Sequence, residues 1–176
     1  MLSNTENSYG SLTKFFHWTI AFLIIFMLFC GYLMTGLKWL NYHKLIGLTI
    51  FSLAVLRVIW TLINKQPKLP QSMPLYEKIL AHTVQFLLYV FMLGMPLSGW
   101  AMASAFGQAP HVFGVQFSMP FIAINPQLGI IFEQIHNTAA IALITVLGLH
   151  LVGALRHHFL IKDDVLKKML PFGKID

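Results

Sequence analysis

The sequence predicts an all-α integral membrane protein built as a four-helix bundle. The 176-residue chain is 57% hydrophobic, only 10% of its residues are charged, and its mean hydropathy is +0.70. Water-soluble domains of this size are normally much less apolar. The apolar residues also form four runs long enough to cross a bilayer, and the connections between them leave no room for a soluble catalytic domain.

Four spans are expected within a single domain that covers residues 1–176, at residues 12–37, 42–63, 79–103 and 129–160. The connection from Lys38 to Asn41 is short, so the second span should return antiparallel to the first. In the third span, Gly94 and Pro96 predict a kink that neighbouring helices must accommodate.

The connections differ in character. Residues 64–78 hold three prolines and three lysines and are expected to form an exposed loop. Residues 104–128 are apolar but interrupted by Gly and Pro, so we expect an aromatic-rich interfacial loop with a short helical turn, and not a fifth span. The tail, residues 162–176, is polar and basic.

The basic residues predict an orientation with both termini in the cytoplasm. Ten of the twelve Lys and Arg residues then fall on the inner side, and only Lys38 and Lys44 fall outside. These residues flank apolar runs and do not cluster on a soluble face, so the formal charge of +6 indicates a lipid bilayer as partner and not nucleic acid. The ten are Lys14, Arg57, Lys65, Lys68, Lys78, Arg156, Lys162, Lys167, Lys168 and Lys174.

Two histidines of the last span, His136 and His150, are fourteen residues apart. Fourteen helical steps end within about 40° of the starting direction and rise about 21 Å, so both rings face the same way at different depths. A single histidine in an apolar helix is more often a hydrogen-bonded core residue than a ligand. Ionisable residues inside a membrane are nevertheless costly and are functional candidates.

The other spans offer partners at the same two depths. His43 lies at the outer end of the second span, where it can pair with His136. At the inner depth, His150 can pair with His17 of the first span or with His82 of the third. A b-type haem takes two axial nitrogens from facing helices, so the pattern predicts two stacked haems.

Helix faces favour His17 over His82. Fourteen residues beyond His17 stands Gly31, which leaves room for a flat macrocycle at the outer depth. The neighbours of His82 at helical spacing are Phe86 and Tyr89, so His82 is assigned a hydrogen-bonding or propionate-side role.

Two cations lie close to these depths. Arg57 is fourteen residues from His43, at the inner depth, where it could pair with a haem propionate or extend to the lipid headgroups. Lys44 could bind the outer propionates or simply mark the edge of the membrane. His111 falls in the broken outer loop, and a surface role is expected for it.

The chain resembles the prokaryotic cytochrome b561 family over nearly its whole length. The matching motifs are FHW at Phe16 to Trp18, HKLIG at His43 to Gly47, the FG...MP pattern from Phe113 to Pro120, His136, and GLH...HH from Gly148 to His158. The resemblance implies a multi-pass protein of the bacterial inner membrane with two haem b groups, ligated by His17 with His150 and by His43 with His136.

The resemblance also implies electron transfer to ubiquinone. Arg156, His157 and His158 end the last span, and histidines near the interface could donate hydrogen bonds and protons to a quinone, His157 among them. The alternative is a basic helix end that interacts with the helix dipole and anionic headgroups.

Three functions are open at this point. In the first, Lys38 and Lys44 attract superoxide to the outer haem, and the chain is a superoxide-to-ubiquinone oxidoreductase. In the second, the chain is the cytochrome subunit of a larger dehydrogenase or hydrogenase, whose partner protein docks on residues 104–128. The third is a structural or transport protein without haem. A single cysteine, Cys30, excludes a disulfide framework, a thiolate iron–sulfur site and a covalently attached haem.

Overall fold

The computed structural model describes residues 1–33 and 37–172 of the chain. Its four long helices are α1 (Ser11–Leu33), α2 (Leu37–Ile63), α3 (Leu75–Ala105) and α4 (Pro126–Arg156). A π-helical turn η1 (His157–Ile161) extends α4, and a short helix α5 (Val165–Met169) follows. Two short strands, β1 (His111–Val112) and β2 (Val115–Gln116), form an antiparallel hairpin.

The predicted membrane bundle is confirmed. All four long helices have the length and apolar composition needed to cross a bilayer. They expose large apolar side chains along their lengths, such as Phe22 of α1, Leu62 of α2, Phe86 of α3 and Ile141 of α4. Lipid tails solvate such side chains, whereas water would not.

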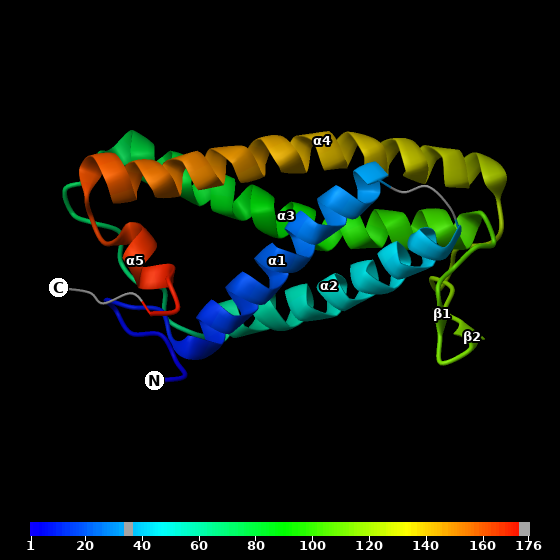
Figure 1. Ribbon diagram of the computed structural model, residues 1–176, viewed down its shortest axis with the longest axis horizontal. Helices are drawn as coiled ribbons and strands as arrows, with labels where there is room; N and C mark the ends of the chain where they lie inside the picture. Colours follow the sequence, from blue (N-terminus) through cyan, green and yellow to red (C-terminus); the bar gives the residue numbers. More distant parts are fainter. Residues whose placement is uncertain (34–36, 173–176) are drawn as a thin grey trace.

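The helices run along the long axis of the molecule, with α4 packed closely on α3 and α1 beside α2 (Figure 1). The N-terminus and α5 lie at one end of the bundle, which we call the inner end. The hairpin lies at the opposite end, which we call the outer end, and projects sideways from the helices.

Helices α2, α3 and α4 each begin earlier than the predicted spans. Residues 38–41, predicted to be a connection, are helical because α2 already begins at Leu37; the connection falls at residues 34–36, outside the described residues. Helix α3 begins directly after Pro74, with Glu77 in its first turn, where a carboxylate interacts favourably with the helix dipole. It continues through Pro96 to Ala105.

Helix α4 begins three residues earlier than predicted. Asn125 caps it through its side-chain oxygen, which accepts a hydrogen bond from the backbone N–H of Leu128 at 3.1 Å. Pro126 occupies the first turn, where its missing N–H costs nothing. The sequence N-P at this point is therefore a helix start, and not part of the preceding loop.

The outer loop contains a β-hairpin in place of the predicted helical turn. Val112 pairs with Val115, and the two residues between them, Phe113 and Gly114, have φ of 51° and 81°. Two consecutive positive φ values are those of a type I′ hairpin turn, which normally carries Asn-Gly or Asp-Gly. The prediction failed because a phenylalanine rarely takes this conformation.

A small apolar cluster occupies the middle of the bundle. Ile20 of α1, Ala54 of α2 and Met92 of α3 are buried together. Ile20 lies one turn from His17, and Ala54 lies one turn from Arg57, in both cases on the side of the outer end. The cluster therefore separates an inner and an outer level of the bundle.

Candidate functional site

The structure brings the histidines together as two pairs. The inner pair is His17 of α1 and His150 of α4, with ring centroids 6.2 Å apart. The outer pair is His43 of α2 and His136 of α4, with ring centroids 6.3 Å apart. Each pair joins helices from different sides of the bundle, because the two α4 histidines share one face and α1 and α2 each present one ring toward it.

Both separations match the span of two imidazoles bound to opposite sides of one metal ion. An imidazole–metal bond measures about 2.0–2.1 Å and the bonding nitrogen lies about 1.1 Å from the ring centre, so such centres lie about 6.2–6.4 Å apart. No cluster of three or more His, Cys, Asp or Glu side chains suited to a metal ion occurs within residues 1–33 and 37–172. Two axial imidazoles therefore fit haem iron, whose other four ligands come from the porphyrin.

In the outer pair, one ring nitrogen of His136 forms a hydrogen bond with Ser98. Its Nδ1 lies 3.0 Å from Ser98 Oγ, and that hydroxyl donates its only proton to the carbonyl of Met95 at 2.9 Å. The hydroxyl must then accept from Nδ1–H, which leaves the lone pair of the ring on Nε2. A hydrogen bond of this kind fixes the tautomer and orientation of a metal-binding histidine.

Glycines make room around the outer rings. A Cβ atom added at Gly99 would lie 3.0 Å from His136 Cε1, so a larger residue there would require the His136 ring to shift away from α3. A Cβ atom at Gly31 would lie 3.8 Å from His43 Cε1. The structure thus places Gly31 at the depth of His43, where the sequence predicted space for a macrocycle.

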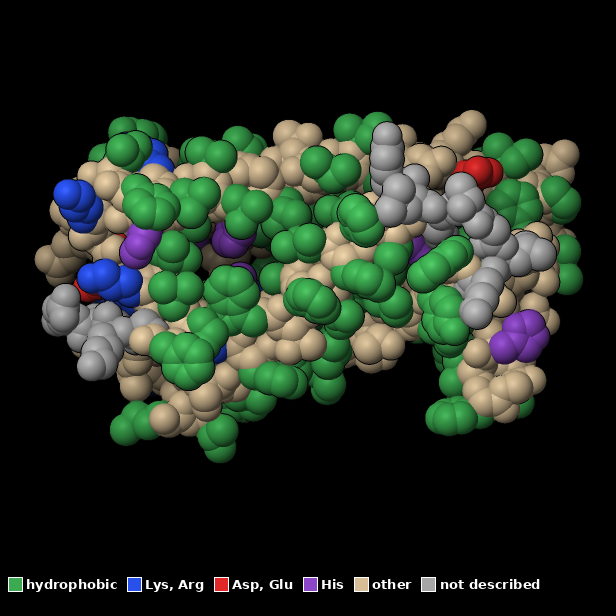
Figure 2. Space-filling view, in the orientation of Figure 1, with side chains coloured by type: hydrophobic (Ala, Val, Ile, Leu, Met, Phe, Trp, Pro, Cys, Tyr) green, Lys and Arg blue, Asp and Glu red, His purple; other side chains and the backbone are tan. Residues whose placement is uncertain are grey.

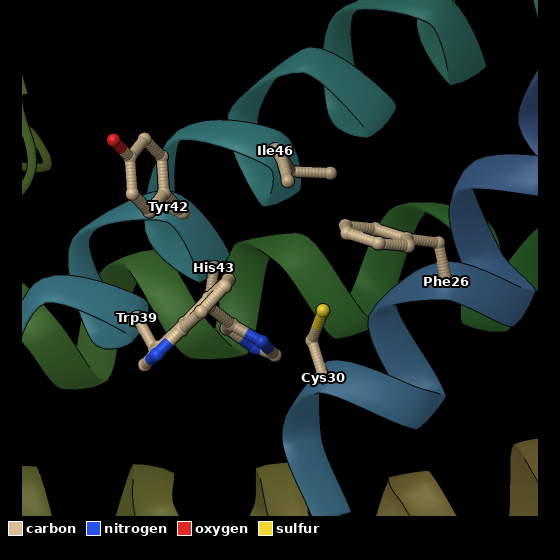
Figure 3. A pocket seen from close by; sticks show the side chains of 6 residues that line it. All are labelled: Phe26, Cys30, Trp39, Tyr42, His43 and Ile46. Carbon is tan, nitrogen blue, oxygen red and sulfur yellow. The ribbon is translucent and has the colours of Figure 1, made fainter. Parts of the chain in front are cut away.

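A cavity of about 540 Å³ adjoins His43 between α1 and α2. This volume is within the usual range of cofactor pockets, about 300–1,000 Å³. His43, Cys30 and Phe26 point toward the space between the two helices (Figure 3). The Nδ1 atom of His43 is buried and has no hydrogen-bond partner in the described part of the chain, which fits a site completed by a bound group. The other lining residues are Trp39, Tyr42 and Ile46.

The inner pair lies beside the guanidinium of Arg57. Its Nη2 is 3.1 Å from His17 Nδ1, and its Cζ lies 5.6 Å from the ring centre of Tyr89. Arg57 is half-buried and points at the histidine, so it does not extend to the headgroups in this structure. A guanidinium only donates hydrogen bonds, so His17 Nδ1 accepts here and the ring proton is on Nε2.

This hydrogen bond has a consequence for metal binding. A neutral His17 that ligates iron through Nε2 must carry its proton on Nδ1, and it then has no lone pair for Arg57. Arg57 would have to release His17 and pair with another acceptor, for which a haem propionate has the required charge.

The N-terminal segment covers the inner level. Trp60 Nε1 donates to Thr13 Oγ1 at 2.9 Å, and Thr13 donates to Asn4 Oδ1 at 2.6 Å. Burial raises the pKa of the Tyr9 hydroxyl, and Tyr89 contributes to the same effect. Neutral polar side chains of the N-terminal segment and α1 thus lie at the inner level, near the half-buried Arg57.

Histidines and basic side chains concentrate toward the inner end. On the face drawn in Figure 2, histidine side chains appear within a hollow near that end, and Lys and Arg side chains gather around it. His82 has an exposed side chain, and His111 is exposed on the hairpin. Of the two inner candidates, His17 is thus the one whose ring lies next to His150.

Of the two outer lysines, the structure describes the side chain of Lys44 but not that of Lys38. Lys44 is partly buried and donates from Nζ to the carbonyl of Gln108 at 2.7 Å, which ties α2 to the outer loop. The side chain of Lys38 lies outside the described residues.

His157 begins η1 at the end of α4 and lies between two carboxylates. Its Nδ1 is 2.6 Å from Asp163 Oδ2, and its Nε2 is 4.0 Å from Glu77 Oε2. Arg156 Nη2 binds the other oxygen of Glu77 at 3.1 Å. The next residue, His158, has a buried Nδ1 without a partner among the residues that the structure describes.

Sequence reasoning missed Ser98, Gly99, Glu77 and Asp163. The first two lie on α3, which carries neither member of a histidine pair, so no spacing rule pointed to them. The Ser-Gly pair within an apolar span could have pointed to them. In membrane helices, small residues allow neighbouring helices to approach closely, and hydroxyl groups form hydrogen bonds to the neighbouring helix.

The sequence profile of the prokaryotic cytochrome b561 family matches residues 8–172. The chain belongs to this family. It is 30% identical to cytochrome b561 homolog 2 of Escherichia coli (strain K12), over 99% of this chain and 97% of that protein. It is 27% identical to cytochrome b561 homolog 1 of the same organism, over 75% of this chain and 74% of that one. It is also 27% identical to the probable superoxide oxidase CybB of Yersinia pestis, over 94% of this chain and 97% of that protein.

Family membership settles the general chemistry. A cytochrome b561 is a multi-pass bacterial membrane protein that holds b-type haem and transfers electrons. The paired histidines at two levels are the part of this chain that fits that group.

Proposed function

We propose that this cytochrome binds two b-type haems and passes electrons from superoxide at its outer end to ubiquinone at its inner end. The observation that carries the proposal is the pair of ring separations, 6.2 Å and 6.3 Å, at two levels of one bundle. His17 and His150 would hold the inner haem, and His43 and His136 the outer haem. Both termini would lie in the cytoplasm.

With two histidines holding it, each haem would supply one-electron transfer and not oxygen binding. The protein fixes the rings: Ser98 orients His136, Gly99 lets the His136 ring lie close to α3, and Gly31 leaves space for the macrocycle. Arg57 would neutralise a propionate of the inner haem. An unpaired charge at the bilayer centre costs roughly 2.5–3.5 kcal/mol on insertion scales, so this pairing also stabilises Arg57 itself.

At the outer end, Lys44 and Lys38 would attract the superoxide anion, and Lys44 could also pair with an outer propionate. The likeness to a protein named probable superoxide oxidase supports this donor. Superoxide gives one electron and leaves as oxygen, so two anions reduce one quinone. At the inner end, His157 and the buried Nδ1 of His158, which has no partner among the described residues, would supply the polar groups that a quinone head requires.

The hairpin favours a second candidate, a cytochrome subunit that receives electrons from a partner protein. The side chains of Phe113 and Phe121 are fully exposed at the outer end, with relative exposures of 102% and 106%. Exposed aromatic residues of this kind occur at protein interfaces as well as at membrane interfaces.

Stopped-flow absorbance of the oxidised, purified protein distinguishes the two candidates. Mixing with superoxide should reduce the haems rapidly, and a soluble ubiquinone analogue should reoxidise them. Haems that accept electrons from dithionite but not from superoxide would contradict the first candidate and leave the partner protein as donor.

A further inference from the structure

The cluster of charged groups around His157 has no part in holding either histidine pair. It lies at the junction of α4, η1 and α3 at the inner end, seven residues beyond His150. The side chains of His157, Glu77 and Asp163 are 12%, 13% and 19% exposed, so the group is largely shielded but still reaches water. The charged and titratable groups in contact with it include Asp163, Glu77, Arg156 and, through Glu77, Tyr76.

The two nitrogens of His157 are in different situations. Nδ1 donates a short hydrogen bond, 2.6 Å, to Asp163, whose other oxygen accepts from the backbone N–H of Val165 at 3.0 Å. Nε2 is 4.0 Å from the nearest oxygen of Glu77, too far for a hydrogen bond. Asp163 thus fixes the ring and its tautomer, and Nε2 is left free to take up and release a proton.

Two carboxylates flank the imidazole ring of His157. Asp163 bonds it directly, and Glu77 places a second negative charge on the Nε2 side, partly balanced by Arg156. A histidine oriented by a carboxylate, with its second nitrogen free, is the arrangement used for general acid–base catalysis. Imidazole is also the side chain whose charge changes near neutral pH.

Quinone reduction needs such a group. Each quinone takes two electrons and two protons, and an O–H bond forms at each of its two carbonyl oxygens. The electrons arrive one at a time through the haems, whereas the protons must come from water. The inner end, where His157 lies near the surface, is the end at which the proposed function puts the quinone.

We propose that His157 donates protons from Nε2 to the quinone and is reprotonated from the inner aqueous phase, with Asp163 and Glu77 as positioning residues. This proposal rests on the proposed function, because it assumes that the quinone is reduced at this end. The alternative role for the cluster is structural: Asp163 accepts a hydrogen bond from the backbone N–H of Val165, the first residue of α5, and thereby holds the C-terminal segment on α4.

The test compares two oxidants of the pre-reduced holoprotein. A soluble ubiquinone analogue needs protons, whereas ferricyanide accepts an electron without any. In His157→Gln, we expect haem reoxidation by the quinone analogue to slow at least about tenfold between pH 6 and 9, with the ferricyanide rate unchanged. Added imidazole should restore the quinone rate, and His111→Gln, which changes an exposed histidine of the hairpin, should behave as wild type.

Asp163→Asn and Glu77→Gln extend the test to the positioning residues. The asparagine retains an oxygen that can accept the hydrogen bond from Val165 N–H, so this hydrogen bond is kept while the negative charge is lost. Both variants should slow haem reoxidation by the quinone analogue and leave the ferricyanide rate unchanged, because each removes a carboxylate charge beside the ring that positions His157. A merely structural role would slow both oxidants or neither.

The outcomes separate this proposal from the proposed function. If wild-type haems are not reoxidised by the quinone analogue, both proposals fail. If they are, and His157→Gln retains the wild-type rate across the pH range, only the role of His157 is overturned.

Discussion

At the scale of single residues, the four paired histidines can each be removed separately. His43→Ala or His136→Ala should lower the haem content from two per chain to one, because haem b is held by its axial ligands and by packing alone. His17→Ala or His150→Ala should remove the other haem. The measurement is the pyridine haemochrome absorbance per mole of purified protein, with His111→Ala as the control.

One outcome would reassign the inner site. A His82→Ala variant that loses a haem, together with a His17→Ala variant that keeps both, would make His82 the inner ligand. The exposed side chain of His82 and the position of the His17 ring beside His150 argue against that result.

The residue scale also shows what spacing can predict. Fourteen-residue steps set the depth of a side chain on its own helix. They placed His43 level with His136 and Arg57 at the inner depth, and the structure brings both histidine pairs together. Spacing left His17 and His82 both open as partners of His150, and it did not predict the contact of Arg57 with His17. Spacing says nothing about which residue of a third helix faces a ring. Ser98 and Gly99 could not be found in this way, because their role depends on how α3 is rotated against α4.

At the scale of helices and strands, the four spans were predictable because long apolar runs have no stable alternative in a membrane. Their ends were not, since caps and turns depend on local backbone conformation. Pro74 and Asn125 each start a helix earlier than the apolar run suggests. The Phe113-Gly114 turn was missed because it places an aromatic residue at positive φ.

The junction of α3 and α4 at the outer end depends on one glycine. A Cβ atom at Gly129 would lie 2.6 Å from Cε1 of the Phe106 ring, which ends α3. Gly129→Ala should therefore destabilise the protein by about 1–3 kcal/mol, the usual effect of overpacking. The melting temperature in detergent would report this loss.

A second glycine provides the matched control. Gly94 of α3 has nothing within 4 Å of a built Cβ atom, so Gly94→Ala should be neutral or stabilising by up to about 1 kcal/mol. The double variant with Phe106→Leu should recover part of the stability lost in Gly129→Ala. A Gly129→Ala protein that melts at or above the wild-type temperature would show that the Phe106 ring moves aside at no cost.

At the scale of the whole molecule, side-chain hydrogen bonds link the C-terminal segment to other parts of the chain at the inner end. Lys14 Nζ donates to the carbonyl of Leu170 at 2.8 Å, and Trp18 Nε1 donates to the carbonyl of Met169 at 2.9 Å. Lys168 Nζ reaches the carbonyl of Lys68 at 3.0 Å. The C-terminal segment is thus fixed to α1 and to the loop between α2 and α3, and lysine side chains make two of these three contacts.

This concentration of lysine predicts the orientation of the molecule in the membrane, because basic segments stay on the cytoplasmic side. In a Cys30→Ser background, Phe113→Cys on the hairpin should react with a membrane-impermeant maleimide in spheroplasts. Lys65→Cys, on the exposed loop after α2, should react only after lysis. The reverse pattern would invert the bundle, and it would then put the proposed superoxide entry in the cytoplasm and proton uptake by His157 on the periplasmic side.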